Sequence, residues 1–470
     1  MLVQESLPFI KDFVEKLDQG LKEIETEAKL SKLQKKWLSF CITCLMISNQ
    51  LNWAKYERMS LGKYKLSGLS WMFRYSKIFW NLLLQASIEV ILAKYSIKEG
   101  ILVGDDSDKK RSKTTKRIYK VHKVYDKDSG GCYQGQTIVF LLLVTEKVTI
   151  PVGFDFYMPD PAISKWNKED KKLRKKGIKK AYRPKKPIAG ADYPSKQEIV
   201  QKLIGSFRKN HSQVKVKSVL VDSFYSNKNF LNRASEQCEN SQVISQLRNN
   251  QVVSFRGKKL SLESYFKMYP GRKETIQIRG KEQEIIVSSA RLYVCSHETK
   301  RFIVAVRYPE NKNFRYLVAT DLSWRTKDII TGYSYRWLIE VFIEDNKLYN
   351  GFGQSAKQFD EEGSRRHLIL SLLLDHCLLL HPQQITRLEN KLPACTAGSL
   401  IQHIKIKSLL RFIQTLVQSG NFENSITRIY SSLSEFYPLA DSSKHMNYCS
   451  FPDLEPAPGC LHRARSCLSS

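Results

Sequence analysis

The chain has 470 residues, enough for two or three domains, and 42% of them are hydrophobic, which excludes a disordered protein. Its 76 Lys and Arg outnumber 46 Asp and Glu, so the formal net charge is +30 and we expect a polyanionic partner. The N-terminus lacks the basic start and apolar core of an export signal, and the longest apolar run, residues 367–380, contains Asp375 and is too short to cross a bilayer. We therefore expect a cytoplasmic protein that binds nucleic acid and not a membrane.

The ten cysteines form no regular framework, and only Cys41 and Cys44 make a C-x-x-C pair. This pair lies in an apolar stretch without a second ligand pair nearby. Buried thiols on a helix are the favoured interpretation, and zinc or redox chemistry is the alternative.

The first 247 residues divide into two parts by their hydrophobic patterns. Residues 1–95 have apolar residues at helical spacing with few helix breakers, which predicts an all-helical domain. Residues 96–247 mix both patterns: short apolar runs end at Asp105 and at Asp222, residues 136–157 predict two strands joined by a turn at Glu146 and Lys147, and residues 195–210 have helical spacing.

The rest of the chain divides into three parts. Strand patterns dominate residues 248–325, with a hairpin turn predicted at Arg279 and Gly280. Helical patterns return in residues 326–440, and from about residue 440 the composition changes to Ser, Pro and Cys. We expect a β-rich insertion at 248–325, C-terminal helices that complete the fold at 326–440, and a disordered tail at 441–470.

A basic run, "SKWNKEDKKLRKKGIKKAYRPKKP", occupies residues 164–187. One interpretation is a solvated loop. The other is a segment that lies along a phosphate backbone, with Trp166 and Tyr182 stacking or wedging against bases.

The stretch "YSYRWLIEVFIEDNK", residues 333–347, predicts a single helix. At roughly 100° per residue, Tyr333, Arg336, Glu340 and Lys347 fall within about 60° of one another and form one polar stripe. The other directions are mostly apolar, so we expect the helix to be buried. Charges on such a helix need partners, for example metals, phosphates or each other.

Three acidic positions share a context: Asp105 or Asp106 ends one strand, Asp222 ends another, and Glu340 lies on the stripe. Packed closely, three carboxylates need a divalent cation, and oxygen ligands select Mg²⁺ or Mn²⁺. Two such ions about 4 Å apart catalyse in-line attack on a phosphodiester. In that arrangement the stripe residues Tyr333, Arg336 and Lys347 would hold phosphates.

Each position also has a structural interpretation. Glu340 and Arg336 form an ordinary i, i+4 ion pair, Asp222 caps a helix, and the two adjacent aspartates close a turn. Asp105 is preferred to Asp106 because it begins the D-x-S frame. Glu344, near the same helix face, is the reserve for the third acid.

The spacing Y-x2-R-x3-E-x6-K in residues 333–347 resembles the motif of a large clade of DDE transposases from bacterial insertion sequences. "LVGDDSDKK" and "VLVDSFYS" are similar to the family's first and second acidic strands, and the resemblance covers roughly residues 95–355. It implies an α/β fold of the ribonuclease H type, a mixed sheet flanked by helices, with a β-rich insertion before the glutamate. It also implies that Asp105 (or Asp106), Asp222 and Glu340 bind two Mg²⁺ or Mn²⁺ ions, and that Tyr333, Arg336 and Lys347 contact DNA at the transposon end.

We therefore expect a nucleoid-associated transposase that binds terminal inverted repeats, cleaves at the ends of its element and joins the 3′-hydroxyl to target DNA. Residues 1–95 would bind the end sequence, and pairing of two ends implies a homodimer on double-stranded DNA. One alternative is a metal-dependent nuclease of the same fold that does not join strands. The other is a catalytically silent DNA-binding repressor derived from a transposase.

Overall fold

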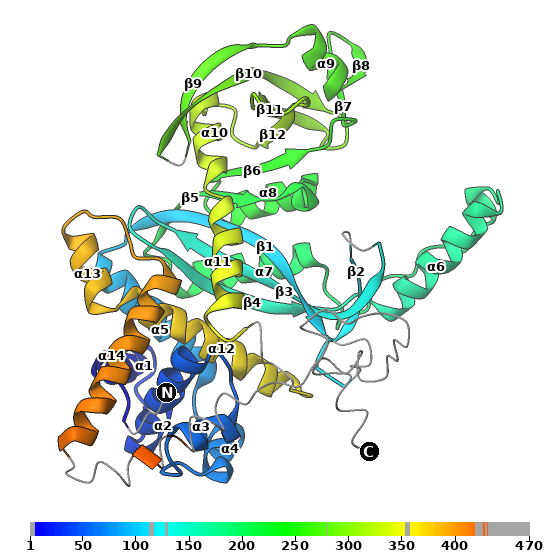
Figure 1. Ribbon diagram of the computed structural model, residues 1–470. Coiled ribbons are helices and arrows are strands. Elements are labelled where there is room, and N and C mark those ends of the chain that lie inside the picture. Colours follow the sequence, from blue (N-terminus) through cyan, green and yellow to red (C-terminus); the bar gives the residue numbers. More distant parts are fainter. Residues whose placement is uncertain are drawn as a thin grey trace, which may run out of the picture.

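The computed structural model describes residues 5–111, 117–126, 130–278, 280–352, 358–418, 426–427 and 430. The predicted tail at 441–470 lies outside the described residues, as do Arg279 and most of 419–440. The described strands form one 12-stranded mixed sheet, flanked by helices, with a helical group at one end and a β-rich part at the other (Figure 1).

The central part of the sheet has the strand order of a ribonuclease H-like fold. Strands β1, β3 and β4 form an antiparallel meander, and β5 and then β6 lie parallel to β1 on its other side. The short β2 pairs with the first residues of β3. The bounds are β1 (Glu99–Arg111), β2 (His122–Tyr125), β3 (Cys132–Val144), β4 (Thr149–Tyr157), β5 (Lys215–Val221) and β6 (Gln242–Leu247).

The β-rich insertion continues this same sheet, because its last strand, β12, pairs antiparallel with β6. The predicted hairpin is confirmed: β9 and β10 pair from Ile278 and Lys281 outward, and Gly280 has the positive φ of 75° that such a tight turn requires. The bounds are β7 (Val252–Phe255), β8 (Lys258–Ser261), α9 (Leu262–Met268), β9 (Arg272–Ile278), β10 (Lys281–Val294), β11 (Thr299–Arg307) and β12 (Arg315–Ala319).

Two hydrophobic clusters cover the two faces of the central strands. In β3 the alternation is direct: Phe140 belongs to one cluster, together with residues of α11, and Val139 belongs to the other, together with residues of α7. The helices α11 and α7 therefore lie on opposite faces (Figure 1). The helices after the first strand are α6 (Pro161–Lys175), α7 (Lys196–Asn210), α8 (Lys228–Gln237), α10 (Thr326–Ser334), α11 (Trp337–Leu348), α12 (Glu361–Leu379), α13 (Pro382–Glu389) and α14 (Ala397–Gln418), with short 3₁₀ turns η1 (Lys180–Tyr182) and η2 (Ser223–Tyr225).

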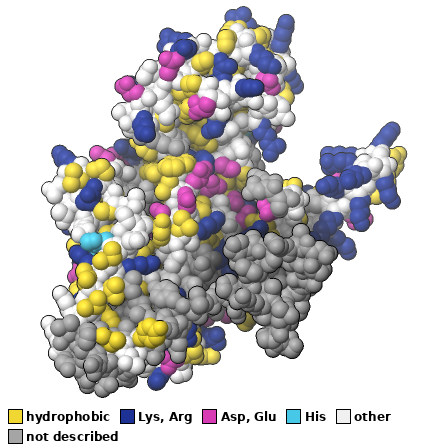
Figure 2. Space-filling model, viewed as in Figure 1, with side chains coloured by type: hydrophobic (Ala, Val, Ile, Leu, Met, Phe, Trp, Pro, Cys, Tyr) yellow, Lys and Arg dark blue, Asp and Glu magenta, His cyan; other side chains and the backbone are white. Residues whose placement is uncertain are grey.

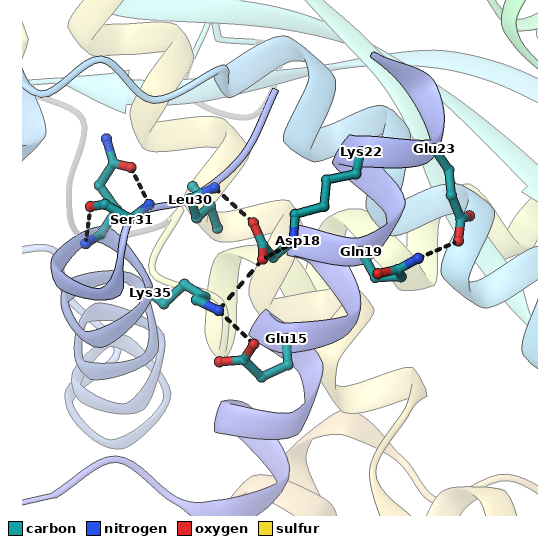
Figure 3. Close-up of polar contacts among 9 residues, drawn as sticks. Glu15, Asp18, Gln19, Lys22, Glu23, Leu30, Ser31 and Lys35 are labelled. Atoms are coloured by element: carbon teal, nitrogen blue, oxygen red, sulfur yellow. Dashed lines mark hydrogen bonds and ion pairs between the residues drawn. The ribbon is translucent and has the colours of Figure 1, made fainter. Parts of the chain in front are cut away.

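The described part of the first 95 residues is helical, and most of its buried apolar side chains join the cluster on the α11 face, while Ile88, Ile91, Leu92 and Tyr95 of α5 belong to the cluster on the α7 face. Asp18 of α1, which is 4% exposed, fixes the entry to α2: its carboxylate accepts hydrogen bonds from the Leu30 amide at 2.7 Å and from Lys22 and Lys35 (Figure 3). Ser31 then begins α2 with a capping box. The bounds are α1 (Pro8–Ile24), α2 (Lys32–Ser48), α3 (Trp53–Met59), α4 (Leu66–Tyr75) and α5 (Trp80–Tyr95).

The prediction of a single buried helix over 333–347 is wrong in two respects. The chain forms two helices, because α10 ends at Ser334 and i, i+3 hydrogen bonds such as Ile339 N–H to the Arg336 carbonyl tighten the turn before α11. Only one side of α11 is buried, with Ile339 and Phe342 inside while Trp337 is 42% exposed. The apolar side chains of α11 therefore do not all enter the core.

Two other predictions concern the cysteine pair and the membrane. Cys41 and Cys44 are buried on α2, and burial raises the pKa of both thiols well above the ordinary value, as structural thiols require. By length and apolar content, no single described helix could cross a membrane, although the bent pairs α4 with α5 and α12 with α13 meet the criterion together.

Candidate active site

The two adjacent aspartates of β1 point to opposite faces of the sheet. Val103 belongs to the cluster on the α11 face and Leu102 to the cluster on the α7 face, so alternation assigns Asp105 to the α11 face and Asp106 to the α7 face. Their contacts agree with this assignment. Asp105 Oδ2 lies 2.9 Å from the Arg336 guanidinium at the start of α11, and Asp106 Oδ2 lies 2.6 Å from Lys196 Nζ at the start of α7.

Asp222 lies beside Asp105 at the carboxyl ends of two parallel strands. The ladder between β1 and β5 ends at the pair Gly104 and Val221, so Asp105 and Asp222 are the next residues of their strands. Neighbouring strands are about 4.8 Å apart, so the two backbones are close at this point. The Asp222 carboxylate also accepts a hydrogen bond from the Phe224 amide at 2.8 Å, which is the predicted capping role, here for η2.

Glu340 reaches the same place through Arg336. The guanidinium of Arg336 donates one hydrogen bond to Asp105 and another to Glu340, so it lies between the two carboxylates. The predicted i, i+4 pair therefore exists, and it also includes an aspartate 231 residues away in sequence. The reserve candidate Glu344 is exposed one turn further along α11. Figure 2 shows acidic side chains gathered near the middle of the visible face.

The electrostatics of this group are those of crowded carboxylates. Burial raises the pKa of Asp105 to about 7, and the negative charges of Asp222 and Asp106 add to the shift, while Arg336 opposes it. Burial also raises the pKa of Asp222, and Asp106 adds to that shift against Arg336 and Lys196. A positive charge at this point would therefore stabilise the ionised carboxylates.

Tyr333 and Lys347 lie at the two ends of the stripe. Burial raises the pKa of Tyr333 to about 12, and the charges that act on it include Arg336, Asp222 and Asp105, which places the phenol beside the acidic group. Burial lowers the pKa of Lys347, and Asp108 further along β1 opposes the shift. The structure thus distributes the stripe along β1: Tyr333 and Arg336 lie at the acids, and Lys347 lies towards the far end of the strand.

Neither Lys196 nor Tyr225 was predicted as a site residue. Lys196 Nζ pairs with Asp106 and lies over the rings of Tyr157 and Phe224, at 5.2 Å and 5.9 Å from their centroids. The Tyr225 hydroxyl donates to Asp106 Oδ1 at 3.4 Å. The sequence does mark the position of Lys196, because the capping box of Ser195 and Glu198 predicts that α7 starts there. It does not predict that Lys196 pairs with Asp106, because that contact depends on how α7 packs on β1.

Asp105, Asp222 and Glu340 carry the oxygen ligands that a divalent ion prefers, and the negative charges around the two aspartates favour a cation. As described, however, no three His, Cys, Asp or Glu side chains in the ranges given above are close enough to hold one ion. Because Arg336 hydrogen-bonds both Asp105 and Glu340, it would have to move for these two acids to share an ion. The donor chemistry therefore fits a divalent metal, and the guanidinium marks the position where positive charge is stabilised.

Residues 69–296 match the family model described as DDE superfamily endonuclease. The match covers a little less than half of the chain and includes Asp105, Asp106 and Asp222, but it ends before Glu340. It supports an endonuclease or transposase function for a chain of this fold, with DNA as the substrate and a general dependence on divalent metal. No curated protein matches the chain.

Proposed function

We propose that this protein is a DDE transposase that binds terminal inverted repeats, cleaves at the ends of its element and transfers the 3′-hydroxyl strand to target DNA. The observation that carries the proposal is that Asp105 and Asp222 follow the last paired residues of two neighbouring parallel strands, while Arg336 hydrogen-bonds both Asp105 and Glu340. The resemblance of residues 333–347 to the transposase motif adds strand transfer to the endonuclease activity that the family match supports.

In this proposal Asp105, Asp222 and Glu340 would hold the metal, and Asp106 would have a different role. Asp106 points to the α7 face and neutralises Lys196, which orients the start of α7. When bound, two Mg²⁺ or Mn²⁺ ions would activate the attacking water or hydroxyl and stabilise the leaving oxygen. Tyr333, Arg336 and Lys347 would position phosphates along β1, and Arg336 would exchange its carboxylate partners for a phosphate.

The N-terminal helices would bind the end sequence, and pairing of two ends would require a homodimer on the DNA in a nucleoid-associated protein of the cytoplasm. The basic surface would supply most of the affinity for double-stranded DNA, so binding would weaken steeply with added salt.

The test is Mg²⁺-dependent cleavage of DNA carrying the repeats that flank the gene, with Asp222→Asn and Glu340→Gln beside the wild type. Both variants should bind the DNA and fail to cut it. Glu344→Gln is the matched control, because it removes the same charge from an exposed position one turn along α11 and should cut normally. Equal loss in the control, or full activity of Glu340→Gln, would contradict the site.

A second candidate is a nuclease that cuts without joining, which the description of the matched family favours. Pre-cleaved ends mixed with a plasmid target separate the two functions: a joined product requires strand transfer, and cutting without it supports the nuclease. If every DNA-dependent effect survives Glu340→Gln, the protein is a silent DNA-binding repressor.

A further inference from the structure

The basic run found in the sequence forms an arm that projects from the body of the protein. Helix α6 leaves the end of β4 and extends into solvent, clear of the other helices and strands (Figure 1). Residues 164–187 contain twelve Lys and Arg and two acidic residues, a net charge of +10 out of the protein's +30. Figure 2 shows the surface of this arm as mostly Lys and Arg. Neither interpretation from the sequence predicted a helix here.

The chain that returns from the helix is tied to it at three levels, so the arm has a built framework. At its base, Asp160 caps the helix and its other oxygen accepts from the Gly190 amide at 2.8 Å. Midway, the Trp166 indole N–H donates to the Pro184 carbonyl at 2.8 Å, so this ring serves as a structural staple rather than a free stacking surface. Further out, Asp170 binds Arg183.

The pair of Asp170 and Arg183 is the most buried charged contact of the arm. The two side chains are 2.6 Å apart and only 11% and 12% exposed, and Arg174 binds the other oxygen of Asp170. At the tip, Gly177 reverses the chain with a φ of 75°, a conformation in which a side chain would be strained. In the described ion pairs, Arg174 and Arg183 are the only cations of residues 161–190 that take part.

Four of the five lysines of the helix point the other way. At roughly 100° per residue, Lys165, Lys168, Lys172 and Lys175 fall within about 80° of one another, on the side opposite Asp170. All four are exposed. Like charges in such a row repel one another, so holding them together on a rigid framework does not stabilise the fold. A polyanion is the partner that would offset the repulsion.

The arm begins on the α7 face of the sheet, beside Asp106. Its helix follows Tyr157, the last residue of β4, and its return chain leads into α7, where Lys196 lies over the Tyr157 ring and pairs with Asp106. Fifteen helical residues span roughly 22 Å. The outer lysines are therefore about six base pairs beyond the base of the arm, measured along a duplex that runs beside it.

We propose that α6 and residues 176–190 form a pre-ordered arm whose row of Lys165, Lys168, Lys172 and Lys175 binds the phosphate backbone of duplex DNA half a helical turn or more from the cleavage point. The proposal rests on the proposed function for the position of the DNA. Tyr182, which is 81% exposed among these cations, is placed to contact the same duplex.

The test is duplex binding by fluorescence anisotropy in EDTA, so that cleavage does not enter the measurement and a failure of the proposed catalysis is seen separately. Replacing the four lysines by Gln should weaken binding at least tenfold and lower the slope of log K against log salt by about 3 to 4. The matched control replaces Lys258, Lys259, Lys300 and Lys312, four exposed lysines of the β-rich insertion, and should leave both values near those of the wild type. Equal losses in the two variants would overturn the proposal, because net charge alone would then explain binding.

A single substitution separates the effect of the framework from the effect of net charge. Asp170→Asn removes a negative charge, so net charge alone predicts tighter DNA binding. The proposed arm predicts weaker binding, because Arg183 and the return chain lose their anchor. An unchanged thermal midpoint would show that the rest of the protein is folded. Duplexes shortened on either side of the cleavage point should abolish the effect of the four lysines when fewer than about six base pairs remain on one side. Tighter binding by Asp170→Asn, or no effect of duplex length, would refute the arm.

Discussion

Asp105 and Asp106 are adjacent in sequence, and the structure predicts opposite outcomes for the same substitution at each. Asp105→Asn removes a charge from the face that holds Asp222 and Glu340, and Asp106→Asn removes one from the face that holds Lys196. Asn preserves the size of each side chain and an oxygen acceptor. The comparison therefore isolates the negative charge.

The first substitution should affect the cleavage rate and the second the free energy of unfolding. If Asp105 binds the metal, its loss should slow cleavage by a factor of about 10³ or more, which is about 4 kcal/mol of transition-state stabilisation. Asp106→Asn should leave the rate within about tenfold. It should instead destabilise the protein by about 1–2 kcal/mol, because it breaks a pair that is 2.6 Å long and about one-fifth exposed, while Lys196 keeps the rings of Tyr157 and Phe224.

Two assays separate these effects: single-turnover cleavage of end DNA in Mg²⁺, and thermal unfolding in EDTA. Asp105→Asn should be inactive with a midpoint near that of the wild type, and Asp106→Asn should be active with a lower midpoint. The reverse pattern would refute the assignment of the two faces. Equal inactivity with equal midpoints would show that both carboxylates serve the metal.

Three further substitutions test contacts described above. Arg336→Ala leaves Asp105 and Glu340 without their shared cation and should destabilise the metal-free protein by about 1–3 kcal/mol, part of which Mg²⁺ should restore; thermal midpoints with and without Mg²⁺ measure both effects, and an unchanged midpoint would contradict the bridge. Lys347→Met should weaken DNA binding and lower its salt slope by about 1 without lowering the midpoint, and an unchanged salt slope would argue against a phosphate contact. For Asp18, burial alone would raise the pKa, but hydrogen bonds from Lys22 and the Leu30 amide lower it below its ordinary value of 3.8, so its stabilisation is complete above that value and is lost as the pH falls through the lower folded-state pKa. Asp18→Ala should therefore lower the free energy of unfolding by about 2–3 kcal/mol at pH 7 and by less below pH 4. Unfolding midpoints of both proteins measured across pH test this. A difference between them that does not change with pH would contradict the linkage.

The sequence was informative wherever a pattern is local. The i, i+4 spacing correctly predicted that Arg336 and Glu340 meet, and alternating apolar runs predicted β3 with β4 and the hairpin of β9 and β10. The ribonuclease H-like fold, which the transposase resemblance implied, is present in the strand order. Domain boundaries and the roles of the site residues stay predictions.

The sequence failed where the answer depends on packing. Strand alternation places Asp105 and Asp106 on opposite faces, but which face carries Glu340 depends on where α11 packs, more than 200 residues later. The break between α10 and α11 has no Pro to mark it, and the nearest glycine, Gly332, lies inside α10, where it accepts an i, i+3 hydrogen bond from Tyr335. The arm was hidden by composition: Asp170 appeared to be one of two acids in a basic run, and only the fold shows that it anchors Arg183.

The distribution of charge explains how a polyanion could approach an acidic site. Asp105, Asp106 and Asp222 repel phosphate, and within the site only Arg336 and Lys196 offset them directly. Attraction therefore has to come from cations outside the site that are held next to the phosphates, since exposed charges in physiological salt are screened over about 8 Å. The arm meets this condition because its lysines are held on a framework that begins at Tyr157 and returns at Lys196. Affinity and chemistry are thus assigned to different residues, which is why loss of an acid should stop cleavage without loosening the DNA.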